Sequence, residues 1–155
     1  MKAEEITRDF FDKELYAIYL AAWEEWGDEA WKIVWRSGEI MLDEIEAELD
    51  LDGTTWIEGL QRLADYLAKV GYVRYISVKQ VGEDRVEYDM FDPAILPGAK
   101  RLVAMGAVPG HVSTTLMFAL LAKRYGLRAE MIGDPDLRDD GHAIEQWRVL
   151  PLEEK

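Results

Sequence analysis

Two histidines are the residues of this 155-residue chain best suited to metal chemistry. His111 follows a Pro-Gly pair at the start of an apolar segment, and His142 follows a glycine at the start of a strand-like segment. If the end of the chain folds back on the apolar segment, both could converge with Glu130, Asp134 or Asp136. Two imidazoles and a carboxylate suit zinc or ferrous iron. No H-x-x-x-H spacing supports this, and two unrelated surface or capping histidines are the commoner arrangement, so both interpretations stay open.

Apolar and aromatic side chains offer a second chemistry, the binding of a small hydrophobic molecule. The chain holds 6 Trp, 7 Tyr, 4 Phe and 6 Met. Two helices cannot easily bury the rings of the N-terminal segment, so some are expected to line a cavity or a subunit interface. Small ligands favour mostly apolar cavities with few polar groups. The candidate pocket comprises Trp31, Trp35, Tyr88, Met90, Leu116, Met117, Leu120 and Trp147. Ordinary core packing is the alternative.

The sequence offers no set of catalytic residues. Cysteine is absent, which excludes disulfides, thiolate nucleophiles and cysteine-type zinc sites. The serines lack a nucleophile-elbow context, and no glycine-rich phosphate loop is present. A binding module is therefore expected rather than an enzyme.

The charge balance restricts the classes of partner. With 31 acidic and 18 basic residues the net charge is −13, which disfavours nucleic acid and anionic membranes. The acidic excess lies in the first 66 residues, with 18 acidic against 6 basic side chains. No apolar run approaches the ~20 residues of a membrane helix, and no secretory h-region is present, so a cytoplasmic location is expected. The lack of Asn and Cys beside many Glu, Lys and Arg is typical of thermophilic proteins.

The elements that must position these residues begin with three helices. Apolar residues recur at helical spacing over residues 4–26, 28–49 and 55–70. Thr55 and Glu58 form a capping-box pattern at the start of the third helix. Gly38 lies on the apolar stripe of the second helix, where glycine costs ~1 kcal/mol relative to alanine. A close helix crossing at Gly38 would explain it.

After residue 71 the apolar period changes to two. Segments 72–81 and 85–91 predict a hairpin, and segments 127–132 and 143–150 predict a second pair of strands. The helix at 112–125 is apolar nearly all round and is expected to be buried on both sides. The order predicts an α+β fold with an antiparallel four- to five-stranded sheet packed against helices. One domain over 1–155 is expected, with a helical layer (4–70) and a sheet with the buried helix (72–150).

The end of the chain carries a recognisable order of short motifs. KRYG closes the apolar helix, LRAEMIG follows, and GHAIEQWRV comes after a short loop. In this order, and in its preceding helices and hairpin, the chain resembles the 4-vinyl-reductase, or hydrocarbon-binding, domain over about residues 30–150. The resemblance implies a fold related to the TRAPP vesicle-tethering subunits. It also implies a homodimer with an internal pocket for a small apolar or aromatic molecule.

The resemblance also bears on the metal. In phenol-sensing members of that family, three cysteines and a glutamate hold zinc. Here Glu130 falls on the glutamate position, Gly133 replaces one cysteine, and His142 and His111 lie near the positions of the other two. The resemblance thus implies a zinc site that is either lost or rebuilt from His111, Glu130 and His142, with Asp134 as a further candidate.

Three hypotheses follow. The leading one is a non-catalytic, sensor-type module that binds a small hydrophobic or aromatic ligand and forms a homodimer. The second is a metal-assisted enzyme in which His111, Glu130 and His142 hold a metal that activates water. The third is a homodimeric scaffold without a ligand.

Overall fold

The N-terminal part of the chain folds as the helical periodicity of its sequence indicates. The computed structural model describes residues 5–107 and 112–153. Its first helices are α1 (Arg8–Trp26), α2 (Trp31–Ile45) and α3 (Trp56–Lys69), with short 3-10 turns at Gly27–Ala30 and Glu46–Glu48. The capping box expected at the start of α3 is confirmed: the Thr55 side chain accepts from Glu58 N, and the Glu58 carboxylate accepts from Thr55 N at 3.1 Å.

The remaining elements form an antiparallel sheet and two further helices. The strands are β1 (Tyr75–Gln80), β2 (Arg85–Phe91), β3 (Leu127–Met131), β4 (Asp136–Leu137) and β5 (His142–Pro151). Helices α4 (Leu96–Ala104) and α5 (Val112–Tyr125) separate β2 from β3. The strand order is β1-β2-β5-β3. The short strand β4 also pairs directly with β5, at Ala143 and Ile144, whereas β3 pairs with the later residues of β5. The α+β class with an antiparallel sheet is therefore confirmed, and β5 joins the two expected strand pairs.

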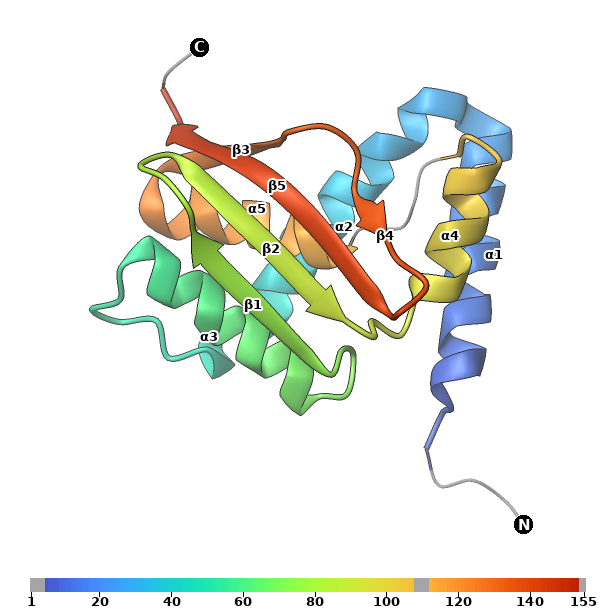
Figure 1. Cartoon of the computed structure of the whole chain (residues 1–155), viewed down its shortest axis with the longest axis horizontal. Helices are drawn as coiled ribbons and strands as arrows, with labels where there is room; N and C mark the ends of the chain where they lie inside the picture. The colour runs from blue at the N-terminus through green and yellow to red at the C-terminus, as the bar shows by residue number, and fades with distance from the viewer. Residues whose placement is uncertain (1–4, 108–111, 154–155) are drawn as a thin grey trace.

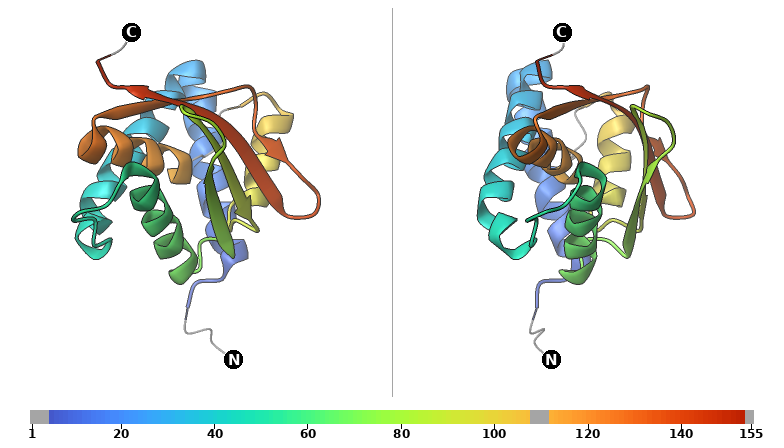
Figure 2. Two further views of the ribbon diagram at one scale, coloured as in Figure 1. Left: turned by 60° about the vertical axis from the view of Figure 1, so that its left-hand side comes forward. Right: turned by 90° about the vertical axis from the view of Figure 1, so that its left-hand side faces the viewer.

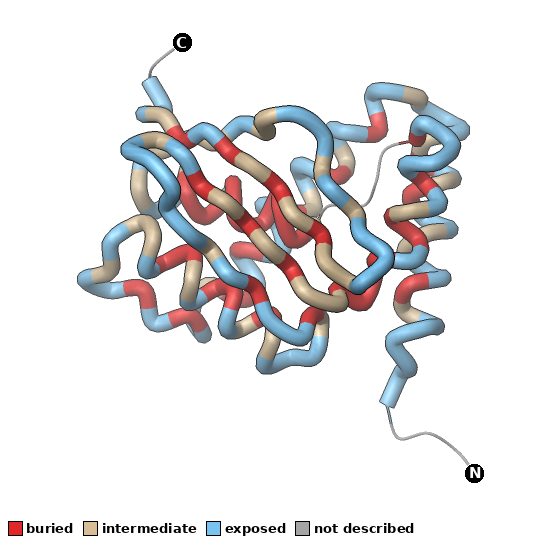
Figure 3. Tube along the Cα trace, viewed as in Figure 1, coloured by how far each residue is buried: buried red, intermediate tan, exposed pale blue. Residues whose placement is uncertain are grey.

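The sheet and the helices form separate layers. The helices lie on one side of the sheet, and the other face of the sheet is uncovered (Figures 1 and 2). Burial alternates along the strands accordingly (Figure 3): on β5, Ala143, Glu145, Trp147 and Val149 are buried, and the residues between them are not. Successive side chains of a strand point to opposite faces. This alternation therefore defines an inner, helix-facing side and an outer, open side.

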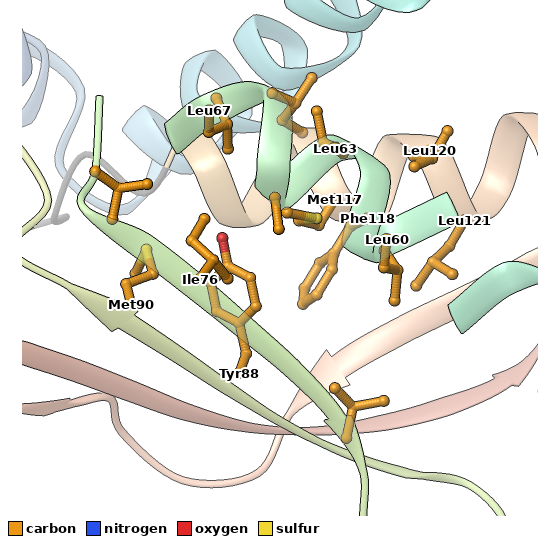
Figure 4. Packing of buried hydrophobic residues seen from close by; sticks show 14 of the residues in the cluster. Leu60, Leu63, Leu67, Ile76, Tyr88, Met90, Met117, Phe118, Leu120 and Leu121 are labelled. Carbon is orange, nitrogen blue, oxygen red and sulfur yellow. The ribbon is translucent and has the colours of Figure 1, made fainter. Parts of the chain in front are cut away.

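Helix α5 packs between the other helices and the sheet, and contributes Leu116, Met117, Phe118, Leu120 and Leu121 to the larger apolar cluster. All its residues from Ser113 to Phe118 are buried, as the nearly continuous apolar sequence predicted. Figure 4 shows Met117, Phe118 and Leu120 among leucines of α3 and the inner face of β2. A second, smaller apolar cluster joins α1, α2 and α4, and consists of Tyr19, Ala22, Ala30, Val34, Leu102 and Ala107.

The crossing of α2 and α5 explains the glycine in the middle of α2. A Cβ atom at Gly38 would lie 2.6 Å from the carbonyl carbon of Thr115 and 2.8 Å from the amide nitrogen of Leu116. At the same crossing, Thr115 Oγ1 donates a hydrogen bond to the carbonyl of Val34 at 3.0 Å. The close approach expected from the sequence is confirmed.

A buried carboxylate attaches α4 to α1. Asp12 Oδ1 accepts a hydrogen bond from the amide of Gly98, in the first turn of α4, at 3.0 Å. Asp12 is 6% exposed. Burial raises the pKa of the Asp12 carboxyl above its ordinary value, and the Gly98 hydrogen bond opposes this rise in pKa. The charged form of Asp12 is therefore disfavoured in the folded state.

This raised pKa predicts a pH-dependent effect of Asp12→Asn. Since the folded pKa exceeds the unfolded one, the stability that the proton on Asp12 contributes is present at low pH and lost as pH rises through the folded pKa. Asparagine keeps the acceptor for Gly98 without that loss. We expect the variant to gain free energy of unfolding relative to wild type between about pH 3 and pH 7. Urea unfolding across this range measures the gain.

Glu14→Gln is the matched control, because it removes one negative charge from an exposed position of α1 that does not affect the Asp12 pKa. A difference between Asp12→Asn and wild type that stays constant with pH would contradict the burial argument.

Candidate functional site

A surface groove lies where α2, α5 and the edge strand β3 meet. Its cavity volume is about 380 Å³. Trp31 and Trp35 stand one turn apart on α2 and form one wall. The remaining lining residues come from α5 and β3, and are Thr114, Thr115, Phe118, Ala129, Glu130 and Met131. The groove is thus mostly aromatic and aliphatic, with two threonines. Glu130 borders it from β3, with its side chain on the outer face of the sheet beside Arg128.

Aromatic rings in contact with one another connect the floor of the groove with the core. The Trp35 and Phe118 ring centroids are 5.5 Å apart, and Phe118 meets Trp147 edge-on at 4.8 Å. Trp147 in turn stacks on Tyr88 at 4.5 Å. Trp31 and Trp35 are 38% and 44% exposed, whereas Trp147 and Tyr88 are fully buried. The groove therefore has one exposed aromatic wall supported by rigid packing beneath it.

The two threonine hydroxyls of the groove direct their protons into the protein. Thr114 Oγ1 donates to the buried Glu145 carboxylate, 2.9 Å and 3.0 Å from its two oxygens. The same carboxylate accepts from the Trp147 indole nitrogen at 2.9 Å. Thr115 Oγ1 lies within hydrogen-bond distance of the Val34 and Val112 carbonyls. Because a hydroxyl has one proton and two lone pairs, Thr114 can only accept a hydrogen bond from a molecule in the groove, whereas the Thr115 hydroxyl lies at the crossing of α2 and α5 beside Gly38.

The structure divides the pocket residues expected from the sequence into two groups. Trp31 and Trp35 line the groove. The other six residues are at most 3% exposed and pack in the core, as Figure 4 shows for several of them; they are Tyr88, Met90, Leu116, Met117, Leu120 and Trp147. Sequence reasoning missed the contributions of α5 and β3 to the groove, including Thr114, Phe118 and Met131. The alternation of apolar and charged residues along 127–131 indicates which side chains face the helices. It does not reveal that β3 is an edge strand.

The prediction of a zinc site is wrong: Glu130 and His142, the two expected ligands within the described residues, do not come together. Glu130 pairs with Arg148 across β3 and β5, whereas His142 lies six positions earlier on β5, which is roughly 20 Å along a strand. The Nδ1 atom of His142 is 2.8 Å from Asp89 Oδ1. His111 lies outside the described residues. Within residues 5–107 and 112–153, no group of three or more His, Asp or Glu side chains could hold a metal ion.

Comparison with known proteins gives structural neighbours only. No protein-family model and no curated protein matches the sequence. A structure from work on haem distortion in the H-NOX family matches with a TM-score of 0.59 and 16% identity, covering 100% of this chain and 79% of that one. An oxygen-binding H-NOX domain related to soluble guanylate cyclases matches with a TM-score of 0.56 and 14% identity, again covering 100% and 79%. A structure from work on haem redox potential and protein-induced porphyrin distortion matches with a TM-score of 0.56 and 14% identity, covering 96% and 78%.

These neighbours overturn the resemblance to the 4-vinyl-reductase domain. That resemblance depended on the order helix, glycine, strand, loop, glycine, strand, and on few identical residues. The order follows from a helix leading into two antiparallel strands, and the glycines at its turns have positive φ, as at Gly126 (64°) and Gly141 (98°). Backbone geometry alone therefore accounts for the glycines.

The helices of the described ranges include none that is both long and apolar enough to span a membrane. At 14–16% sequence identity, the similarity to these structures shows a shared fold and nothing about the ligand. The chain shares the fold of H-NOX domains.

Proposed function

We propose that this chain is a non-catalytic binding module that holds a small aromatic molecule in the groove between α2, α5 and β3. The observation that carries the proposal is the lining of that groove, with Trp31, Trp35 and Phe118 around a cavity of about 380 Å³. Pockets for small molecules are typically ~300–1,000 Å³ and mostly apolar, with a few placed polar groups. The match to H-NOX structures supports the proposal only through the fold.

Haem, with which two of the structural neighbours are described, does not fit the described residues of this chain. Protein-bound haem iron takes an axial ligand from His, Cys, Met or Tyr. Cysteine is absent, and the one histidine in the described ranges, His142, bonds Asp89 beside Phe91 and Tyr75. The groove is lined by no histidine or tyrosine, and its one possible ligand, Met131, has no histidine beside it in the groove to complete a Met/His pair of the cytochrome c kind. The space between sheet and helices is filled by Tyr88, Met117, Phe118 and their neighbours (Figure 4).

The polar atoms of the groove suggest which aromatic molecule binds. Thr114 lines the groove, and its hydroxyl can only accept a further hydrogen bond, because its proton is donated to Glu145. A hydrogen-bond acceptor in an otherwise apolar groove favours a neutral ring that carries a donor, such as a phenol or an indole.

Binding of 2-naphthol, compared with 2-methoxynaphthalene, tests this proposal. The two rings are alike, but only the naphthol donates a hydrogen bond. A net hydrogen bond contributes about 0.5–1.5 kcal/mol, so we expect 2-naphthol to bind about two- to tenfold more tightly. Isothermal titration calorimetry measures both dissociation constants.

Trp35→Ala should weaken 2-naphthol binding by up to about tenfold, since it removes one aromatic wall. Trp26→Ala is the control, because Trp26 is 55% exposed and does not line the groove. Absence of saturable binding, or equal binding by Trp35→Ala and wild type, would overturn the proposal. Circular dichroism confirms that each variant is folded.

A further inference from the structure

Strand β3 forms one edge of the sheet and presents unpaired backbone groups. In the described part of the chain, no strand lies on its outer side. Ile132 N donates to Gln146 O at 2.7 Å, and Leu152 N donates to Gly126 O at 2.9 Å. Residues of an antiparallel pair alternate between facing the partner strand and facing away. The N–H and C=O groups of Leu127, Ala129 and Met131 therefore point away from β5, toward the open edge.

The opposite edge of the sheet is closed by a side chain. Gln61 of α3 donates from Nε2 to the carbonyl of Ile76 at 3.1 Å, and its Oε1 accepts from the amide of Val78 at 3.3 Å. The amide of Gln61 thus occupies the backbone groups that an added strand would need on β1. Proteins commonly block exposed edges in such ways, because open edges pair with other chains. The contrast between the edges singles out β3.

The side chains of β3 are complementary to a second copy of the same strand. If two β3 strands pair antiparallel about Ala129, Arg128 lies opposite Glu130 of the partner subunit, and Glu130 opposite the partner's Arg128. Opposite charges directly across an antiparallel pair are stabilising. Arg128 Nη1 and Glu130 Oε2 of one chain are already 3.3 Å apart, so four charges of alternating sign would meet on the outer face. On the inner face, Leu127 lies opposite the partner's Met131.

We propose that the chain forms a twofold-symmetric dimer in which β3 pairs with β3 of a second copy, centred on Ala129. The pairing joins the two sheets into one and satisfies the outward backbone groups of Leu127, Ala129 and Met131. The strand itself is electrically neutral, with one Arg and one Glu, although the whole chain carries a net charge of −13. The dimer does not depend on the ligand proposed above.

Charge reversal at two positions tests this register by sedimentation equilibrium. Arg128→Glu places four carboxylates around the axis of a homodimer, and Glu130→Arg places four guanidinium groups there. Each variant alone is expected to raise the dimer dissociation constant by about tenfold or more. An equimolar mixture of the two is expected to form heterodimers with nearly wild-type affinity, because opposite charges face each other again.

Two further variants complete the test. Lys79→Glu makes the same change of charge on the exposed side of β1, and is expected to leave the association unchanged. Ala129→Pro removes an N–H that faces the open edge, and is expected to abolish the dimer while circular dichroism shows a folded chain.

A wild-type chain that stays monomeric at its highest soluble concentration would overturn the inference. A dimer that survives both Arg128→Glu and Ala129→Pro would equally overturn it. Association is measured without 2-naphthol, so failure of the dimer and failure of 2-naphthol binding by the wild-type chain are separate results.

Discussion

Gly38→Ala is expected to lower the free energy of unfolding by about 1–3 kcal/mol, as overpacking of a closely packed site does. The added methyl group would lie 2.6 Å and 2.8 Å from backbone atoms of Thr115 and Leu116. Backbone atoms of a buried helix cannot rotate away, so α2 and α5 would have to separate. Separation would also stretch the hydrogen bond from Thr115 Oγ1 to Val34 O.

Glu39→Ala is the matched control, because it introduces alanine at an exposed position of the same helix. Exposed substitutions usually change stability by less than about 0.5 kcal/mol. Helix propensity alone would make Gly38→Ala stabilising by ~1 kcal/mol, so the two effects differ in sign. Urea unfolding decides between them, and a stabilised Gly38→Ala variant would show that the helices separate at little cost.

Trp147→Ala is expected to have the largest effect on stability of any substitution considered, about 3–5 kcal/mol. Trp147 is fully buried and lies between Tyr88, at 4.5 Å, and Phe118, at 4.8 Å. Its removal leaves a cavity under the groove and takes the support from Phe118, which in turn contacts Trp35. The hydrogen bond from the indole N–H to the buried Glu145 carboxylate is lost as well.

Trp147→Phe separates the contribution of ring packing from that of the hydrogen bond to Glu145. The phenyl ring keeps most of the stacking but cannot donate to Glu145, so we expect a smaller loss of about 1–3 kcal/mol. Trp26→Ala controls for the loss of an exposed indole. Thermal unfolding followed by circular dichroism ranks the three variants, and a Trp147→Ala protein as stable as Trp26→Ala would contradict the packing described here.

Local features of the fold could be predicted because their causes are local. The capping box at Thr55 and Glu58 needs only four consecutive residues. The buried helix follows from apolar residues on every side of 112–125, and the hairpin from an apolar period of two on either side of Gly82. The glycine at position 38 predicted a close crossing because an interior helix position otherwise disfavours glycine.

The candidate site depended on strand pairing, which the sequence left open. His142 and Glu130 belong to adjacent strands, yet the register places Glu130 opposite Arg148 and His142 opposite Phe91. The expected metal site therefore does not form, although both residues are on the same sheet. The pocket residues were chosen for their apolar character, which does not distinguish a residue that lines a groove from one that fills the core.

The sequence by itself determined the longer helices and strands, their order, the α+β class and the absence of thiol chemistry, since periodicity, capping and composition act within each segment; α4 and β4 were found only in the structure. Only the tertiary structure decided that β5 lies between β2 and β3, that β3 is an open edge, and that Trp31 and Trp35 face a groove while Trp147 is enclosed. Those outcomes depend on contacts between residues far apart in the chain. The hydrophobic effect that drives such contacts is non-directional, so shape and strand register, rather than residue type, decide which apolar side chains remain accessible.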